Sequence, residues 1–147
     1  GAYQVDFSPT ADRLRVDATA VARAIEFEDE AALFDSLILC KFLRGVFTDK
    51  LAELSQMLQL VTGWEVVPTE LTATAQRIVT VRKRFNVSAG WTPAEDTLPP
   101  RFFQEQLPSG ASAGAQLNAA HLEQLKQVYY SLRGWDPQGY PGTAEEI

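Results

Sequence analysis

Residues that commonly carry chemistry are scarce in this sequence. Its 147 residues include one cysteine and one histidine, which excludes an internal disulfide. A glycine-rich phosphate loop, a nucleophile elbow and a histidine pair at metal-ligand spacing are all missing. No apolar run approaches the roughly 20 residues that a membrane-spanning helix needs. The chain by itself is therefore expected to carry no catalytic motif and to have no membrane partner.

Basic residues are also few, and the net charge is −6. The only dense basic cluster is Arg82-Lys83-Arg84, whereas binding a phosphate backbone needs clustered lysine and arginine. We interpret these three residues as complementing the dipole at the end of a helix. Nucleic acid is therefore not an expected partner. A single cysteine fits a reducing compartment, and we expect a cytoplasmic protein.

The composition is otherwise that of a folded domain. Apolar residues make up 46% and charged residues 22%, which is ordinary for a soluble protein of one domain. Apolar residues recur at steps of three and four, and no alternating strand pattern of useful length occurs. The pattern predicts an all-α bundle of about four main helices. The predicted helices cover residues 17–42, 48–63, 68–85 and 118–134.

Helix signals accompany these ranges. Asp17 and Asn118 suit N-cap positions. Gly45 is predicted to end the first helix, or helix pair, while Gly63 and Gly134 end the second and the fourth. Residues 1–16 are predicted to be an irregular lead-in, and residues 143–146 to begin one more helical turn.

A connection rich in proline and glycine separates the third and fourth helices. Residues 86–117 contain four prolines and three glycines, which is long for a connection without structure of its own. We expect one helical turn at residues 101–105 and expect the rest to cover a surface that this chain lacks. In the isolated chain that expectation implies either mobility or self-association through an exposed aromatic patch.

Candidate acid–base residues receive no catalytic assignment. His121, at the third position of the last predicted helix, is interpreted as structural. The acidic run of Glu26, Glu28, Asp29 and Glu30 falls on several helix faces and is interpreted as solvated surface. Acid–base work would require burial of one of these carboxylates to shift its pKa.

Cys40 has three possible roles. Composition alone favours a buried packing residue, because apolar residues surround it in the sequence. A reactive thiol is a weak interpretation, since the adjacent Lys41 points to another helix face. As a ligand of a cubane iron–sulfur cluster, Cys40 would need three further cysteines from outside this chain.

The surrounding motifs favour the third role. Residues 35–40, Asp-Ser-Leu-Ile-Leu-Cys, resemble the Asp-x-x-Gly-Leu-Cys motif of the aldehyde:ferredoxin oxidoreductase family. The resemblance continues through residues 96–102, Asp-Thr-Leu-Pro-Pro-Arg-Phe, and residues 129–136, Tyr-Tyr-Ser-Leu-Arg-Gly-Trp-Asp, in the same order. We therefore assign residues 17–147 to a domain that resembles the C-terminal domain of this family.

The resemblance implies roles for three residues. Asp35 and Leu39 correspond to residues that contact a pterin, and Cys40 to the last ligand of a [4Fe–4S] cluster. On a helix end, spacings of four and five place the three residues on one side. Ile38 departs from the glycine of the motif, and glycine permits a closer backbone approach to a cofactor. A hydrogen bond from nearby backbone amides is an alternative role for Asp35.

The implied activity belongs to a larger enzyme. The family oxidises an aldehyde to a carboxylate with a tungsten (or molybdenum) bis-pterin and passes electrons through the cluster to ferredoxin. The expected partners are upstream domains of the same enzyme and ferredoxin or an electron-transfer subunit. We expect the isolated chain to be inactive and to carry no cofactor. Two alternatives are a cofactor-free helical interaction module and a family branch with other chemistry, such as reduction of an aromatic thioester.

Overall fold

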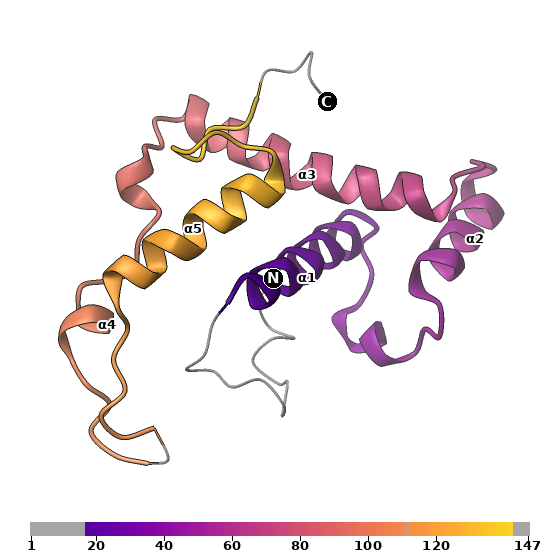
Figure 1. The fold of residues 1–147 in the computed structure, drawn as a ribbon. Coiled ribbons are helices and arrows are strands. Elements are labelled where there is room, and N and C mark those ends of the chain that lie inside the picture. The colour runs from indigo at the N-terminus through magenta and orange to yellow at the C-terminus, as the bar shows by residue number, and fades with distance from the viewer. Residues whose placement is uncertain (1–16, 111, 143–147) are drawn as a thin grey trace. The chain divides into compact units, whose positions relative to one another are not determined.

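The computed structural model describes residues 17–110 and 112–142 (Figure 1). All regular elements within these residues are helical, so the prediction of an all-α fold with four main helices is confirmed. None of the helices in this part is long and apolar enough to span a membrane. The predictions for residues 1–16 and 143–146 lie outside the described ranges. The elements, with η marking 3-10 helices, are α1 (Ala18–Ser36), η2 (Lys41–Gly45), α2 (Lys50–Thr62), α3 (Pro68–Ser88), η3 (Pro93–Glu95), α4 (Arg101–Gln104) and α5 (Ala119–Arg133).

Helix α5 shows how local signals set the helix ends. Asn118 Oδ1 accepts the backbone N–H of His121 at 3.1 Å, which satisfies a donor that the first turn leaves free. Gly134 ends the helix with φ 67°, a left-handed conformation that glycine adopts without strain. Asp49 and Gly63 play the same two parts for α2. These predicted ends are confirmed.

The first helix is shorter than predicted. Helix α1 ends at Ser36 instead of near Phe42, and Gly45 is the last residue of η2 and does not end α1. Beyond Ser36 the chain still places Leu39 and Phe47 against the core. Apolar spacing therefore continues across the break, because spacing reports which residues are buried and not whether the helix is continuous.

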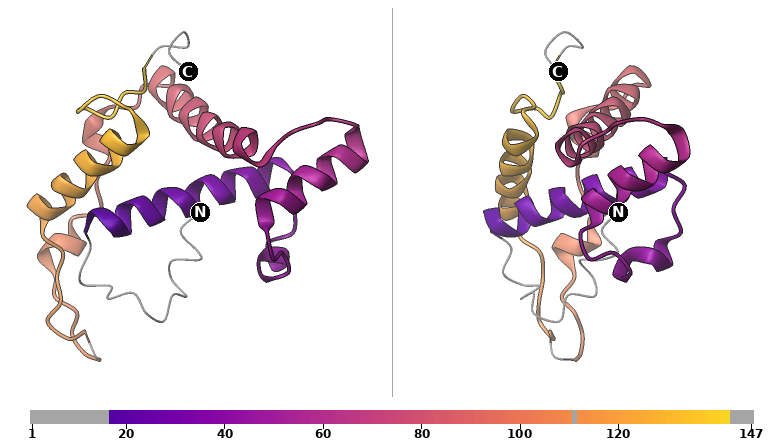
Figure 2. Two further views of the ribbon diagram at one scale, coloured as in Figure 1. Left: turned by 45° about the vertical axis from the view of Figure 1, so that its right-hand side comes forward. Right: turned by 90° about the vertical axis from the view of Figure 1, so that its right-hand side faces the viewer.

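The described residues divide into two compact units, the first comprising residues 26–82. In this unit the chain leaves α1, passes through η2 and turns into α2 (Figure 2). Phe34 meets Phe47 edge to face, with ring centroids 5.9 Å apart. Burial of each large apolar side chain contributes about 1.5–3 kcal/mol. The buried core residues are Leu33, Phe34, Leu54, Leu71 and Ala75.

The second unit comprises residues 17–25 and 83–142, residue 111 excepted. It is organised around an ion pair between a buried lysine and a half-buried aspartate. Lys83 Nζ lies 2.9 Å from Asp96 Oδ2, and Tyr130 Oη donates to the same oxygen at 2.6 Å. The Lys83 ammonium also lies over the Trp91 ring, 3.1 Å from its centroid. These four residues, called the Asp96 cluster below, join α3 and the following segment to α5.

Charge and burial shift two pKa values within the Asp96 cluster. Burial raises the pKa of Asp96, but the hydrogen bonds from Tyr130 and Lys83 and the positive charge of Lys83 outweigh it. The pKa of Asp96 therefore lies below its ordinary value. Burial and the hydrogen bond to Asp96 raise the pKa of Tyr130 well above its ordinary range. Asp96 is consequently ionised, and Tyr130 neutral, at neutral pH.

The basic run does not complement a helix dipole as predicted. Helix α3 continues to Ser88, so Arg82, Lys83 and Arg84 precede its last turn. Lys83 is buried in the Asp96 cluster, and Arg84 donates to the backbone carbonyl of Gly142. Lys83 and Arg84 reach these positions because their partners, Asp96 and Gly142, lie far along the chain. The residues next to the basic run therefore gave no sign of this burial.

The connection after α3 has more structure of its own than predicted. It contains η3 and the single turn α4, which confirms the turn expected near residues 101–105. Trp91 packs edge to face on Tyr140, with centroids 5.5 Å apart, instead of on an absent surface. The Leu107 N–H donates to the Ala115 carbonyl at 3.0 Å, which closes a loop beyond α4. Figure 1 shows this loop near the N-terminal end of α5.

Candidate functional site

The last turn of α1 and the turn that follows it contain the three residues that the sequence singled out, Asp35 within the helix and Leu39 and Cys40 beyond it. The Leu39 N–H donates to the Phe34 carbonyl at 3.0 Å, and the Ile38 N–H to the Asp35 carbonyl at 3.3 Å. This pair of bonds, with Leu39 packed against the core beside Phe34, is the Schellman pattern of a helix end. The pattern requires a left-handed residue immediately before Leu39.

Ile38 occupies that left-handed position with φ 55°. It is the only described residue other than glycine with a positive φ. For a residue with a Cβ this conformation costs about 1–2 kcal/mol, and Ile adds the crowding of a branched Cβ. The turn thus keeps a glycine-type backbone at the position where the family motif has glycine. In the sequence, the sign of this conformation is that Ile38 stands where the family motif has glycine, a residue that adopts positive φ without strain.

Cys40 is exposed, so the composition-based interpretation as a buried packing residue is wrong. Its backbone is extended, with φ −64° and ψ 130°, and precedes η2. The Cys40 carbonyl accepts the Leu43 N–H at 3.0 Å. Because α1 has already ended at Ser36, Cys40 lies off the apolar stripe that its neighbours suggested. Its thiol is accessible to a group that approaches from outside the chain.

The three candidate residues differ in accessibility. Asp35 lies in the last turn of α1 and is exposed, like Cys40. Leu39 is only half-exposed because it packs against the core. The helical geometry that we used to place all three on one side is wrong, since the helix does not reach Leu39 or Cys40. The Schellman turn brings the three residues into one short segment instead.

This segment offers one thiol and one carboxylate to a ligand. Among the described residues, no group of three or more histidine, cysteine, aspartate and glutamate side chains could hold a metal ion. Cys40 supplies one thiol, fewer than the four thiolates that a cubane iron–sulfur cluster takes.

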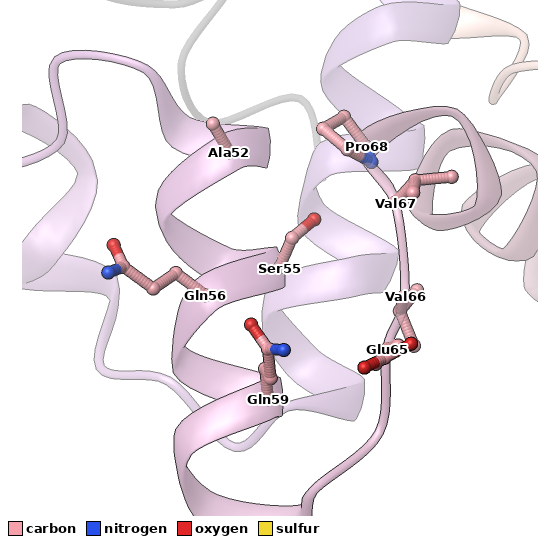
Figure 3. Close-up of a pocket in the computed structure, with 8 residues that line it drawn as sticks. All are labelled: Ala52, Ser55, Gln56, Gln59, Glu65, Val66, Val67 and Pro68. Carbon is pink, nitrogen blue, oxygen red and sulfur yellow. The ribbon is translucent and has the colours of Figure 1, made fainter.

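A shallow groove of about 360 Å³ on α2 is a second candidate site (Figure 3). Ser55 points toward the segment that follows α2, whereas Gln56 points away from it. The Ser55 hydroxyl already donates to the Leu51 carbonyl at 2.9 Å. The lining includes one carboxylate, from Glu65, and no histidine, cysteine or lysine. This groove therefore holds no set of groups for catalysis or metal binding.

A wider groove of about 840 Å³ lies between α4 and the loop that follows it. Its apolar lining comes from Phe102, Leu107 and Leu117. The charged lining residues, Arg101 and Glu105, form an exposed ion pair with a 3.4 Å separation. An exposed pair of this kind contributes little energy.

The histidine and the acidic residues that the sequence analysis considered for acid–base catalysis take part in helix capping, ion pairing or burial. The backbone N–H of His121 is engaged by the N-cap of α5. Glu30 forms an ion pair with Lys50, at 2.5 Å. Asp29 is buried, so the prediction of a fully solvated acidic run is wrong at that residue. The acidic run lies within helix α1, and the helix face that carries Asp29 turns inward. The sequence shows the charges of these residues but not which face of the helix is buried.

Comparison with known proteins identifies the family. The family described as aldehyde ferredoxin oxidoreductase, domains 2 & 3, matches residues 2–146. The tungsten-containing aldehyde ferredoxin oxidoreductase of Pyrococcus furiosus is 36% identical over 117 residues, 78% of this chain and 18% of the relative. That of Thermococcus kodakarensis is 35% identical over 121 residues, 81% of this chain and 19% of the relative.

These relatives are much longer than the matched region. A third relative, from Pyrococcus horikoshii, carries the same name and is 34% identical over 121 residues, again 19% of its own length. The chain thus spans about a fifth of the curated relatives that it matches. Together with the collinear motifs and the all-α fold, the match shows that this chain belongs to the aldehyde ferredoxin oxidoreductase family, in the region of domains 2 and 3.

Proposed function

We propose that this chain is the C-terminal part of an oxidoreductase that oxidises aldehydes to carboxylates and passes the electrons to ferredoxin. The observation that carries the proposal is the exposed Cys40, which ends the Asp-x-x-x-Leu-Cys run of a family member. A cysteine without a ligand role is usually buried as a small apolar residue. Exposure at this position instead suits a thiolate that other domains complete into a cluster site.

Each candidate residue has a chemical task in this proposal. When bound, the tungsten-pterin supplies the two-electron oxidation and the [4Fe–4S] cluster the path for electrons. Cys40 contributes one of the four thiolates that such a cluster takes. The Asp35 carboxylate accepts hydrogen bonds from N–H groups of the pterin. Leu39, held by the core, presents an apolar edge beside it and excludes water.

The remaining parts of the enzyme lie outside this chain. The other three cluster thiolates and the acid–base groups must come from the four-fifths of the relatives' length that the chain does not match. We therefore propose upstream domains of the same enzyme as its permanent partner and ferredoxin, or an electron-transfer subunit, as its transient one. The chain alone is proposed to be inactive.

The test is Cys40→Ala in the complete enzyme. We expect the variant to lose its cluster and the broad absorbance near ~400 nm, and to stop reducing ferredoxin. Ser36→Ala, which removes a hydroxyl that donates to the Ala32 carbonyl within the last turns of α1, is the control and should keep about four irons per chain. If Cys40→Ala also keeps its full iron content, the cofactor-free interaction module becomes the better description.

A further inference from the structure

Two apolar side chains beside Cys40 are almost fully exposed. Ile38 is 92% exposed and Phe42 91% exposed, and Val46 follows at 66%. Leu37, Leu39 and Phe47 of the same segment pack against the core. The segment from the end of α1 through η2 therefore divides its apolar residues into an inward set and an outward set. The outward set, Ile38, Phe42 and Val46, is not part of the core of this unit, and Ile38 and Phe42 are its most exposed members.

The backbone at Ile38 holds its side chain outward at a cost. Its φ of 55° is unfavourable for a branched residue, and glycine or asparagine would form the same turn with less strain. Strain of this kind persists in structures where it serves a site or a contact. A solvent-exposed isoleucine gains nothing in the free chain that would offset it.

We propose that Ile38 and Phe42 are the apolar anchors through which this domain contacts the rest of its own enzyme. This inference rests on the proposed function. Cys40 lies between the two anchors in sequence, and a one-thiol cluster site requires the other domains to approach this segment. The chain matches only about a fifth of its relatives, so most of the proposed enzyme is available to cover these side chains.

Apolar anchors of this size suit an obligate contact. Interface energy concentrates in a few buried aromatic and aliphatic side chains at the centre of the contact. Covering Ile38 and Phe42 would exclude water from the space around Cys40. A cluster bound there would then be protected from solvent. The left-handed turn at Ile38 then acts as a positioning device that aims one anchor into the interface.

The first experiment uses Phe42→Asp in the complete enzyme after its metals are removed. We expect calorimetry to show one cooperative unfolding transition for the unmodified protein and a separate, earlier transition for this domain in the variant. Leu60→Asp is the matched control, because Leu60 is 78% exposed on α2 but remote in sequence from Cys40. If both variants unfold alike, Phe42 is not an anchor. Phe42→Ala serves as a second, milder variant.

The second experiment uses Ile38→Gly. The proposal predicts that this substitution stabilises the isolated chain but destabilises the same domain in the metal-free complete enzyme. In the isolated 147-residue chain the denaturant midpoint should rise, because strain is relieved and no packed side chain is lost. In the metal-free complete enzyme the domain should separate at lower temperature, because an anchor is lost. If Ile38→Gly raises stability in both settings, Ile38 has no part in the contact.

Neither readout requires a cluster or a pterin, so failure here is distinct from failure of the proposed function, which Cys40→Ala tests. A third measurement addresses a second copy of this chain as the occupant. The Cys40 thiol of the isolated chain should react with a thiol reagent at the same rate at every protein concentration. The contrary result is that the thiol is protected at high protein concentration, that light scattering gives a doubled mass, and that Phe42→Asp abolishes both effects. That result would show that a second copy of this chain, and not the upstream domains, covers Ile38 and Phe42.

Discussion

Gly139 illustrates how one residue fixes the closing turn of the second unit. Asp136 Oδ1 accepts the backbone N–H groups of Gln138, at 2.8 Å, and Tyr140, at 2.9 Å, and the turn folds back on α5. Gly139 has φ 85°, and a Cβ built there would lie 2.6 Å from the Tyr130 ring. Both the backbone conformation and the close approach therefore require glycine.

We predict that Gly139→Ala lowers the free energy of unfolding by about 3 kcal/mol, the sum of left-handed strain and overpacking. Gly114→Ala is the matched control, since Gly114 has φ 82° but nothing within 4 Å of a built Cβ. The control should lose only about 1 kcal/mol. Urea denaturation of both variants measures the difference, and equal losses would show that the Tyr130 contact carries no energy.

Ile38 presents the opposite case at the same scale. Its left-handed backbone would favour glycine, yet no core contact explains the larger side chain, which is 92% exposed. A residue that breaks a local rule without a visible gain in the free chain directs attention to what covers it. This is the physical basis for assigning Ile38 to an interface.

The Asp96 cluster operates at the scale of elements, because its members come from α3, the segment after it and α5. Lys83 and Asp96 are thirteen residues apart, and Asp96 and Tyr130 thirty-four. Trp91 covers Lys83 and contacts Tyr140. The second unit thus relies on a half-buried charge pair among aromatic rings, whereas the first unit relies on an apolar core.

We predict that Asp96→Asn destabilises the chain by about 2 kcal/mol at neutral pH, because Lys83 loses a charged hydrogen-bond partner while buried. The folded-state pKa of Asp96 is lowered, so its contribution is fully present above the unfolded value near ~4. The contribution disappears as the pH falls through the lower folded-state pKa.

The stability difference between the two proteins should therefore be constant from neutral pH down to about 4 and shrink below that. Glu105→Gln is the control, because the Arg101–Glu105 pair is exposed on both sides and should contribute less than about 1 kcal/mol. Thermal or urea unfolding across this pH series provides the measurement. A difference that grows below pH ~4 would contradict the assignment of Asp96 as the charged partner.

At the scale of the whole molecule, we propose that the chain provides one part of a cofactor site. Cys40 is the single cysteine, and the described residues include no group of three or more metal-binding side chains. The relatives that carry tungsten in their names are about five times the matched length. Assembly with other domains is therefore central to the proposed function.

We predict that the isolated chain, purified aerobically or anaerobically, contains neither an iron–sulfur cluster nor tungsten, because one thiolate cannot hold a cubane. Elemental analysis and an ultraviolet–visible spectrum test this prediction, with the complete enzyme as the positive control. About four irons per chain and a band near ~400 nm would contradict it. A mass measurement on the same sample identifies a cluster shared between several chains.

Local chemistry in the sequence determined the class of fold and most helix ends. Asn118 and Gly134 bracket α5, and Gly63 ends α2, because capping and left-handed turns depend on a few adjacent residues. The order of motifs also determined the family, through residues 35–40 and the closing run at residues 129–136. These features need no knowledge of distant contacts.

Only the tertiary structure decided which polar residues are buried and which apolar residues are exposed. Lys83 is buried because Asp96, Trp91 and Tyr130 converge on it from other elements, a convergence that no local pattern encodes. Cys40 is exposed because the Schellman bonds end α1 four residues earlier, although the apolar spacing continues. Hydrophobic periodicity indicates which residues tend to be buried, whereas backbone hydrogen bonds and long-range packing decide where the chain turns.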